Sequence, residues 1–237
     1  MKTARTLLIA LIVPVLFTSC QKINGKGDVI SESRTVTGYH GIGLSTDASV
    51  YLTSGDEYSL EVLAQENLMP YIQTVIENGI LVIKFKNGVH MGHHEPISVY
   101  ITAPGISSLA VSGSGKIDVT NDWMGSSMEL TISGSGDIRL GYVTCNTLRA
   151  TISGSGNISA QGGTAGYEDL TISGSGNIDI RSILSQTTDA DISGSGDIYT
   201  QVAGTMDATI SGSGNIYYLG TPQMNIHISG SGNIIKL

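Results

Sequence analysis

The fold is decided by the stretch Leu130-Thr131-Ile132-Ser133-Gly134-Ser135-Gly136-Asp137-Ile138-Arg139-Leu140. Its central hexapeptide, Ser-Gly-Ser-Gly-x-Ile, occurs seven times, beginning at Ser112, Ser133, Ser153, Ser173, Ser193, Ser211 and Ser229. Successive copies lie 18 to 21 residues apart. A repeat of about twenty residues is typical of one coil of a solenoid.

Apolar and polar residues alternate inside each copy, a period of two that is typical of extended chain with one buried face. If the copies stack, the residue before each motif forms one apolar column: Val111, Ile132, Ile152, Ile172, Ile192, Ile210 and Ile228. The isoleucine that ends each motif forms a second: Ile117, Ile138, Ile158, Ile178, Ile198, Ile216 and Ile234. These columns predict an all-β protein with a parallel β-helix, or β-solenoid, of about seven rungs over residues 112–237. Each fully buried isoleucine would contribute ~1.5–3 kcal/mol.

Two kinds of position inside the motif allow several interpretations. The glycines indicate a bend, a positive φ, or a close approach of opposite walls. The x position holds Lys116, Asp137, Asn157, Asn177, Asp197, Asn215 and Asn233. This column fits a ladder of side-chain hydrogen bonds or a set of turn residues. A calcium site is a third alternative, which we disfavour because each coil offers one such residue and most of them are Asn.

Residues 28–111 lack the motif but still have the pattern of strands, at residues 48–53, 59–63, 80–85 and 97–101. Turn residues separate these strands at 54–56 and 77–79, and residues 67–76 could form a short helix. Because solenoids need capped ends, we expect this N-terminal β region to cap the first coil. Only three residues follow the last motif, so we expect homo-oligomerisation through the C-terminal rung, or a partner covering it.

The first residues resemble a bacterial lipoprotein signal peptide. Lys2 and Arg5 precede an apolar run at residues 7–17, and Cys20 follows directly. The run is shorter than the ~20 residues of a membrane span. We therefore expect residues 1–19 to be removed, Cys20 to be lipidated and residues 20–27 to be a tether. The expected location is the outer membrane, facing the periplasm or the cell surface; the lack of an acidic run after Cys20 favours the periplasm.

The composition excludes several function classes. The chain has 12 Lys and Arg against 20 Asp and Glu. Removal of Lys2 and Arg5 with the signal peptide leaves 10 basic and 20 acidic residues, a net charge of 10 − 20 = −10. This negative charge argues against a nucleic-acid partner. Cys145 is the only other cysteine, so no disulfide is expected within the mature chain.

Several further segments, together with the repeats, resemble the family described as "putative auto-transporter adhesin, head GIN domain". They are residues 40–42 leading into 50–52, residues 67–68, residues 79–83 and the segment Val99-Tyr100-Ile101-Thr102-Ala103-Pro104. The resemblance covers roughly residues 28–237. It implies a β-helix, favours a right-handed one, and implies an adhesin-like envelope lipoprotein. We expect no membrane barrel in this chain, which would be a departure from true auto-transporters.

Three groups of residues are candidates for a site. His90, His93 and His94 could bind zinc or nickel, but Gly88 and Gly92 indicate a loop, and we favour a histidine-rich surface loop without a metal. Asp118, Asp179 and Arg139 could serve a polysaccharide-active enzyme, but the column they share mixes residue types and favours a solvated face. Tyr199, Tyr217 and Ile235 fall on consecutive coils and predict an exposed strip for interactions.

These observations favour a non-catalytic adhesin-like binding module with no catalytic residues and no cofactor. Its partners would be the membrane, through the lipid, and a glycan or protein ligand that binds the ladders of Ser, Thr, Asn and Asp. A self-assembling structural lipoprotein of the periplasm is the alternative. A polysaccharide-active β-helix enzyme is a more distant one.

Overall fold

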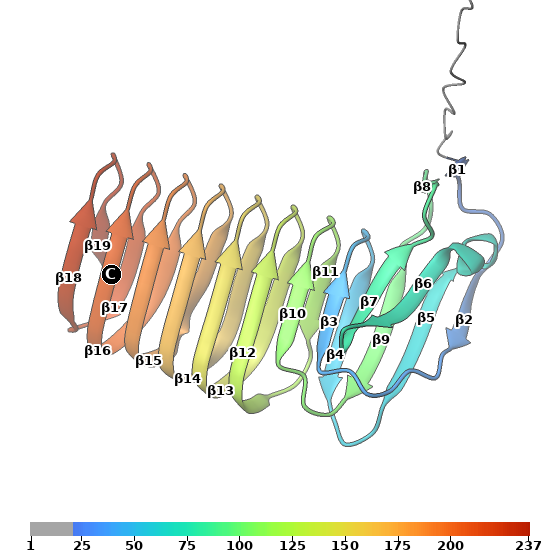
Figure 1. The fold of residues 1–237 in the computed structure, drawn as a ribbon, viewed down its shortest axis with the longest axis horizontal. Coiled ribbons are helices and arrows are strands. Elements are labelled where there is room, and N and C mark those ends of the chain that lie inside the picture. The colour runs from blue at the N-terminus through green and yellow to red at the C-terminus, as the bar shows by residue number, and fades with distance from the viewer. Residues whose placement is uncertain (1–20) are drawn as a thin grey trace, which may run out of the picture.

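Long strands wind around a common core in the computed structural model, which describes residues 21–237 (Figure 1). Four of them each run through most of one coil: β13 (Asp137–Ile152), β14 (Asn157–Ile172), β15 (Asn177–Ile192) and β16 (Ile198–Ile210). Each pairs in parallel with the next, as in Ile152 with Ile172, and the register shifts at two points between β15 and β16. The predicted all-β solenoid is confirmed. The predicted signal peptide and Cys20 lie outside the described residues.

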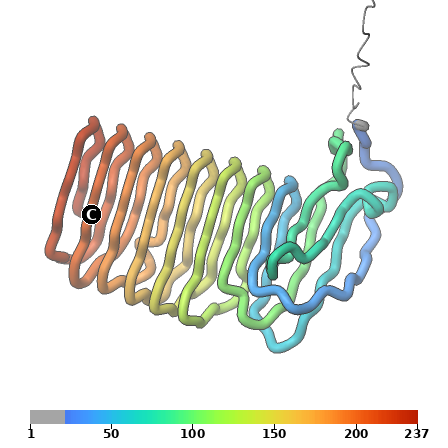
Figure 2. Tube along the Cα trace, in the orientation of Figure 1, coloured from blue at the N-terminus to red at the C-terminus, as the bar shows by residue number. Residues whose placement is uncertain are grey.

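Each coil is flattened, so the stacked strands form two walls (Figure 2). One wall joins β9 (Ser98–Ala103), β4 (Ser49–Ser54), β11 (Lys116–Val119), the first halves of the long strands, β17 (Ile216–Gly220) and β19 (Ile234–Lys236). The other joins β7 (Ile80–Phe85), β3 (Gly41–Leu44), β10 (Ser108–Val111), β12 (Trp123–Ile132), the second halves of the long strands and β18 (Gln223–Ile228).

The first coils do not follow chain order. β3 lies between β7 and β10, and β4 lies between β9 and β11. The chain therefore builds the β3–β4 coil, adds the β7–β9 coil on its outer side, and returns to add β10 and β11 on the inner side. The parallel stack thus begins upstream of the first Ser-Gly-Ser-Gly copy.

Antiparallel strands close the N-terminal end of both walls. β5 (Ser59–Gln65) pairs with β9 and then with β2 (Val29–Ser33), while β6 (Ile72–Glu77) pairs with β7. The helix expected in residues 67–76 is only partly present: a 3₁₀ helix covers Glu66–Tyr71, and β6 takes up the rest. Residues Gln21–Ile23 form β1, which pairs with β8 (Val89–Met91).

The two isoleucine columns form the core. From Val111 to Ile210 and from Ile117 to Ile216 every member is at most 1% exposed. In the last coil, by contrast, Ile228 is 41% exposed. The alternation of each strand thus sends its isoleucines inward, as expected from a period of two.

The glycines of the motif lie at bends along the upper edge in Figure 1, and none of them has a positive φ. A Cβ on Gly154 would lie 1.9 Å from the carbonyl oxygen of Gly134, and one on Gly156 would lie 1.8 Å from that of Gly136. The close approach is therefore between glycines of successive coils rather than between opposite walls. Only glycine lets the bends stack at the spacing of a β-ladder.

Candidate functional site

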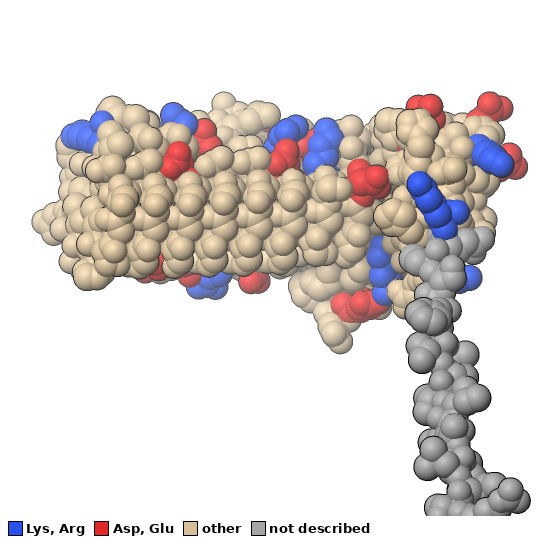
Figure 3. Space-filling model, turned by 90° about the horizontal axis from the view of Figure 1, so that it is seen from above, with Lys and Arg blue, Asp and Glu red and all other residues tan. Residues whose placement is uncertain are grey.

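Most outward side chains of the two walls differ from coil to coil, whereas the two inward isoleucine columns are nearly uniform. The motif serines are exposed along the upper edge. Seen from above, this edge is a regular array without Lys, Arg, Asp or Glu over the middle of the solenoid, and charged side chains lie along its two long margins (Figure 3). The charged side chains therefore belong to the outward columns of the two walls rather than to the middle of this edge.

One column of the β9–β4–β11 wall contains both aromatic and charged residues. Pairing places its members on successive coils in the order Tyr100, Tyr51, Asp118, Arg139, Ser159, Asp179, Tyr199, Tyr217 and Ile235. The structure thus brings Tyr199, Tyr217 and Ile235 together on consecutive coils.

The two tyrosines near the C-terminal end form an ordered stack. Their ring centroids are 4.5 Å apart and the planes differ by 6°. The guanidinium of Arg181 lies over the outer face of Tyr199, 4.1 Å from its centroid, and Asp179 accepts two hydrogen bonds of 2.8 Å from Arg181. Burial raises the pKa of Tyr199, and the charge of Asp197 adds to the shift. Because ring faces cover one another, the strip presents ring edges, hydroxyls and a cation–π contact to its surroundings.

The acidic residues of the same column do not form a catalytic pair. Asp118 and Asp179 are three coils apart, ~14 Å at ~4.8 Å per coil, whereas glycosidase carboxyls lie ~5–9.5 Å apart. Asp118 is 2.9 Å from Lys116, and Arg139 is 3.0 Å from Asp137. These contacts are those of a surface ion-pair network.

The column at the x position is a ladder of side-chain hydrogen bonds. Oδ1 of Asp137 accepts from both the backbone N–H and the side-chain amide of Asn157, at 3.2 and 3.0 Å. Asp197 and Asn215 repeat this arrangement at 2.7 and 3.2 Å. Since these oxygens are used within the ladder, the column has a structural role, as the favoured interpretation predicted.

The three histidines of the loop are not arranged as a ligand set. Nε2 of His94 lies 3.1 Å from Asp47, and its Nδ1 lies 2.7 Å from the carbonyl oxygen of Glu95. His90 belongs to β8, and the backbone of His93 pairs with Asn24 and Gly25. Across residues 21–237, no three His, Cys, Asp or Glu side chains come together in a way that could hold a metal.

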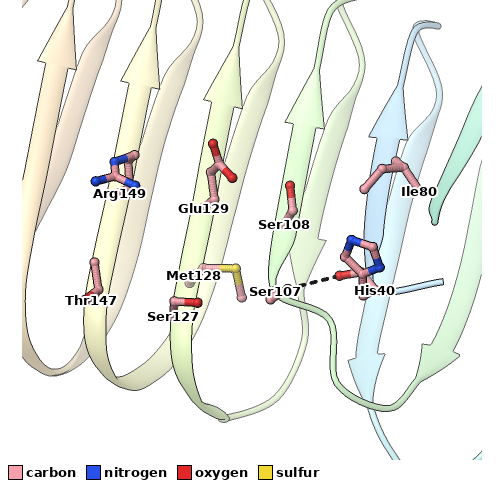
Figure 4. Close-up of a pocket in the computed structure, with 9 residues that line it drawn as sticks. All are labelled: His40, Ile80, Ser107, Ser108, Ser127, Met128, Glu129, Thr147 and Arg149. Atoms are coloured by element: carbon pink, nitrogen blue, oxygen red, sulfur yellow. Dashed lines mark hydrogen bonds between the residues drawn. The ribbon is translucent and has the colours of Figure 1, made fainter. Parts of the chain in front are cut away.

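A hollow crosses the outer side of the wall that contains β7, β3, β10 and β12 (Figure 4). This site was not predicted from the sequence. The hollow is lined by residues from five neighbouring strands or just before them: Ile80, His40, Ser107, Ser108, Ser127, Met128, Glu129, Thr147 and Arg149. Register places Ser108, Glu129 and Arg149 side by side on successive coils. Nε of Arg149 donates a 2.8 Å hydrogen bond to Asp169 on the next coil.

A carboxyl group lies inside the solenoid, where sequence reasoning named only apolar residues. Glu168 is fully buried, and Oε2 accepts hydrogen bonds from Thr188 at 2.9 Å and Thr200 at 2.7 Å, while Oε1 is buried without a partner. Burial raises the pKa of Glu168 to about 7, although the hydrogen bonds oppose the shift. The alternation could have revealed it, because Glu168 has the same parity as Leu170 and Ile172.

The family described as "Putative auto-transporter adhesin, head GIN domain" matches residues 38–222, most of the chain. The chain belongs to this family. This confirms the resemblance predicted from the repeats and the upstream segments, and it indicates a binding module of the cell envelope or surface rather than an enzyme.

Solved structures share the fold of this GIN-domain protein. A putative adhesin from Bacteroides fragilis is 22% identical with a TM-score of 0.86, over 91% of this chain and 100% of its own. A putative lipid binding protein from Parabacteroides distasonis is 26% identical with a TM-score of 0.78, over 92% and 100%. A putative adhesin from Parabacteroides merdae is 20% identical with a TM-score of 0.74, over 92% and 99%. A comparison with curated proteins gave no match.

The part of the GIN-domain protein that the structure describes contains no helix that is long and apolar enough to span a bilayer.

Proposed function

We propose that this GIN-domain protein is a non-catalytic, adhesin-like lipoprotein, anchored to the outer membrane by a lipid on Cys20, that binds a protein or glycan through its outward columns. Family membership supports an adhesin-like role. The signal-like sequence before Cys20 supports the anchor.

The observation that carries the proposal is the Arg181–Tyr199–Tyr217 ladder. On these coils the outward column changes from Asp179 to two stacked rings that remain partly exposed, and the guanidinium of Arg181 lies over one of them. Tyr and Arg are the residues that most often dominate binding energy at interfaces. A ladder that presents ring edges and a guanidinium suits a protein surface or a polar glycan edge better than a flat sugar face.

Adherence of a deletion strain, with and without the complementing gene, tests the proposed function. We expect deletion to lower adherence to host or neighbouring cells, and protease treatment of intact cells to cleave the protein. If the protein is cut only after the outer membrane is broken, it does not face outward and direct adhesion is excluded.

A pair of variants tests the ladder itself. Complementation with the double variant Tyr199→Ala and Tyr217→Ala should restore less adherence than the parent gene. Tyr142, which is 56% exposed and lies outside the ladder, provides the matched control Tyr142→Ala. Equal adherence of all three strains would reject the ladder as the binding surface.

A further inference from the structure

The hollow on the β3–β10–β12 wall extends across several strands. Its volume is about 290 Å³, near the lower limit of small-molecule sites. Its lining comes from the neighbouring strands β7, β3, β10, β12 and β13 and the residues just before β3 and β10. At ~4.8 Å between strands, these five strands span ~19 Å. A space of this shape fits an extended chain that lies along the solenoid axis better than a compact ligand.

The hollow exists because the wall changes its strand length at this point. β3 and β10 have four residues each, whereas the adjacent β12 has ten. The extra length of β12 carries Met124, which is 78% exposed, out beyond the shorter strands. The hollow is therefore a step in the wall, and the neighbouring coils hold its shape.

Unused hydrogen-bonding groups line this step. The hydroxyls of Ser108, Ser127 and Thr147 and the carboxylate of Glu129 line the hollow, and none of them has a hydrogen-bond partner elsewhere in residues 21–237. Three hydroxyls, each both donor and acceptor, and one carboxylate acceptor match the hydroxyl groups of a sugar. Ile80 adds an apolar surface for its C–H groups.

The charges at the hollow disfavour an acidic ligand. The guanidinium of Arg149 is compensated by Asp169, whereas the carboxylate of Glu129 has no cation within 4 Å among the described residues. An incoming carboxylate or sulfate group would be repelled by Glu129.

We propose that this hollow is a subsite for a linear chain of neutral sugars. The inference rests on the proposed function and specifies the ligand class that the module binds. The sugar chain lies along the solenoid axis, and Glu129 accepts hydrogen bonds from its hydroxyls while the serine and threonine hydroxyls bind it on either side.

Isothermal titration calorimetry on the mature protein tests the subsite. The probes are cellotriose, maltotriose and mannotriose, with trigalacturonate as the acidic comparison. We expect at least one neutral trisaccharide to bind and trigalacturonate not to. Glu129→Ala should weaken binding about tenfold, as expected for loss of a charged acceptor. Asp207→Ala is the matched control, because Asp207 lies in the same outward column four strands away, and it should leave binding unchanged.

Three results would overturn the inference: no binding of any neutral trisaccharide, tighter binding of trigalacturonate, or equal binding by Glu129→Ala and the parent. The adherence of the deletion strain distinguishes failure of the sugar subsite from failure of the proposed adhesin role. If deletion abolishes adherence but no trisaccharide binds, the subsite is rejected while the adhesin role stands. If a trisaccharide binds as expected but deletion leaves adherence unchanged, the adhesin role is rejected.

Discussion

Replacing the buried carboxyl group of Glu168 by an amide should change how the stability of the solenoid depends on pH. Glu168 lies between Leu148 and Thr188 in an inward column, with no solvent exposure and one oxygen that has no partner. A carboxylate is costly in such a place, so burial raises the pKa from its ordinary value of 4.5 to about 7. Glu168→Gln has nearly the same shape and no charge at any pH.

The magnitude follows from the difference between the two pKa values. The folded protein binds the proton more tightly than the unfolded chain, so the contribution of Glu168 to stability is fully present below pH ~4.5 and is lost as pH rises through about 7. A difference of about 2.5 units at 1.36 kcal/mol per unit is about 3 kcal/mol. The wild-type protein should therefore lose about 3 kcal/mol between pH 4.5 and pH 8 from this group alone, whereas the variant should not.

Urea denaturation at pH 5 and pH 8 measures this effect, with a constant m-value as the condition for comparison. Glu57→Gln removes a charge at an exposed position and serves as the control, because it leaves the core unchanged. The difference in unfolding free energy between the two pH values should be smaller in Glu168→Gln than in wild type and Glu57→Gln by about 2–3 kcal/mol. An equal pH dependence in all three proteins would refute the reasoning.

Three further outcomes follow from the same geometry. Gly154→Ala would place a methyl group 1.9 Å from a carbonyl oxygen of the preceding coil and should cost roughly 3 kcal/mol or more in urea denaturation, whereas Gly43→Ala, with its nearest neighbour at 3.6 Å, should fold normally. Asn177→Ala removes one step of the amide ladder and should cost about 1 kcal/mol by the same assay; no loss would mean that the ladder does not stabilise the fold. Burial raises the pKa of the Cys145 thiol to about 11, so peptide mapping should find it unalkylated by iodoacetamide at neutral pH until the protein is unfolded.

The repeats could be predicted in detail because each residue of the motif has one environment. A period of two sets which side chain faces inward, and the 20-residue spacing of these copies sets the register, so Ile138, Ile158 and Ile178 had to stack. The sequence showed that the motif needs glycine but left three reasons open: a bend, a positive φ, or a close approach of opposite walls. Only the structure shows that the contact is with the glycine of the adjacent coil.

The N-terminal coils were not predictable in the same way. Strands β4, β7 and β9 lie within a few residues of where alternation placed them. Their spatial order does not follow the chain, because β3 and β4 are inserted between coils that are later in sequence. Local periodicity determines which face of a strand is buried but says nothing about which partner buries it. The hollow was missed for the same reason, since it joins His40 and Ile80 to residues of β12 and β13.

The structure separates the positions that maintain the fold from those free to carry function. An inward isoleucine touches the coils before and after it, and a motif glycine touches the carbonyl beneath it, so a change at either position disturbs a stack of coils. Tyr199 and Glu129 face outward on coils that the same core supports, so their replacement changes the surface at little cost in stability. A single outward column of this protein can therefore change while the solenoid stays the same. For this reason, differences among the outward columns are where a binding partner should be sought.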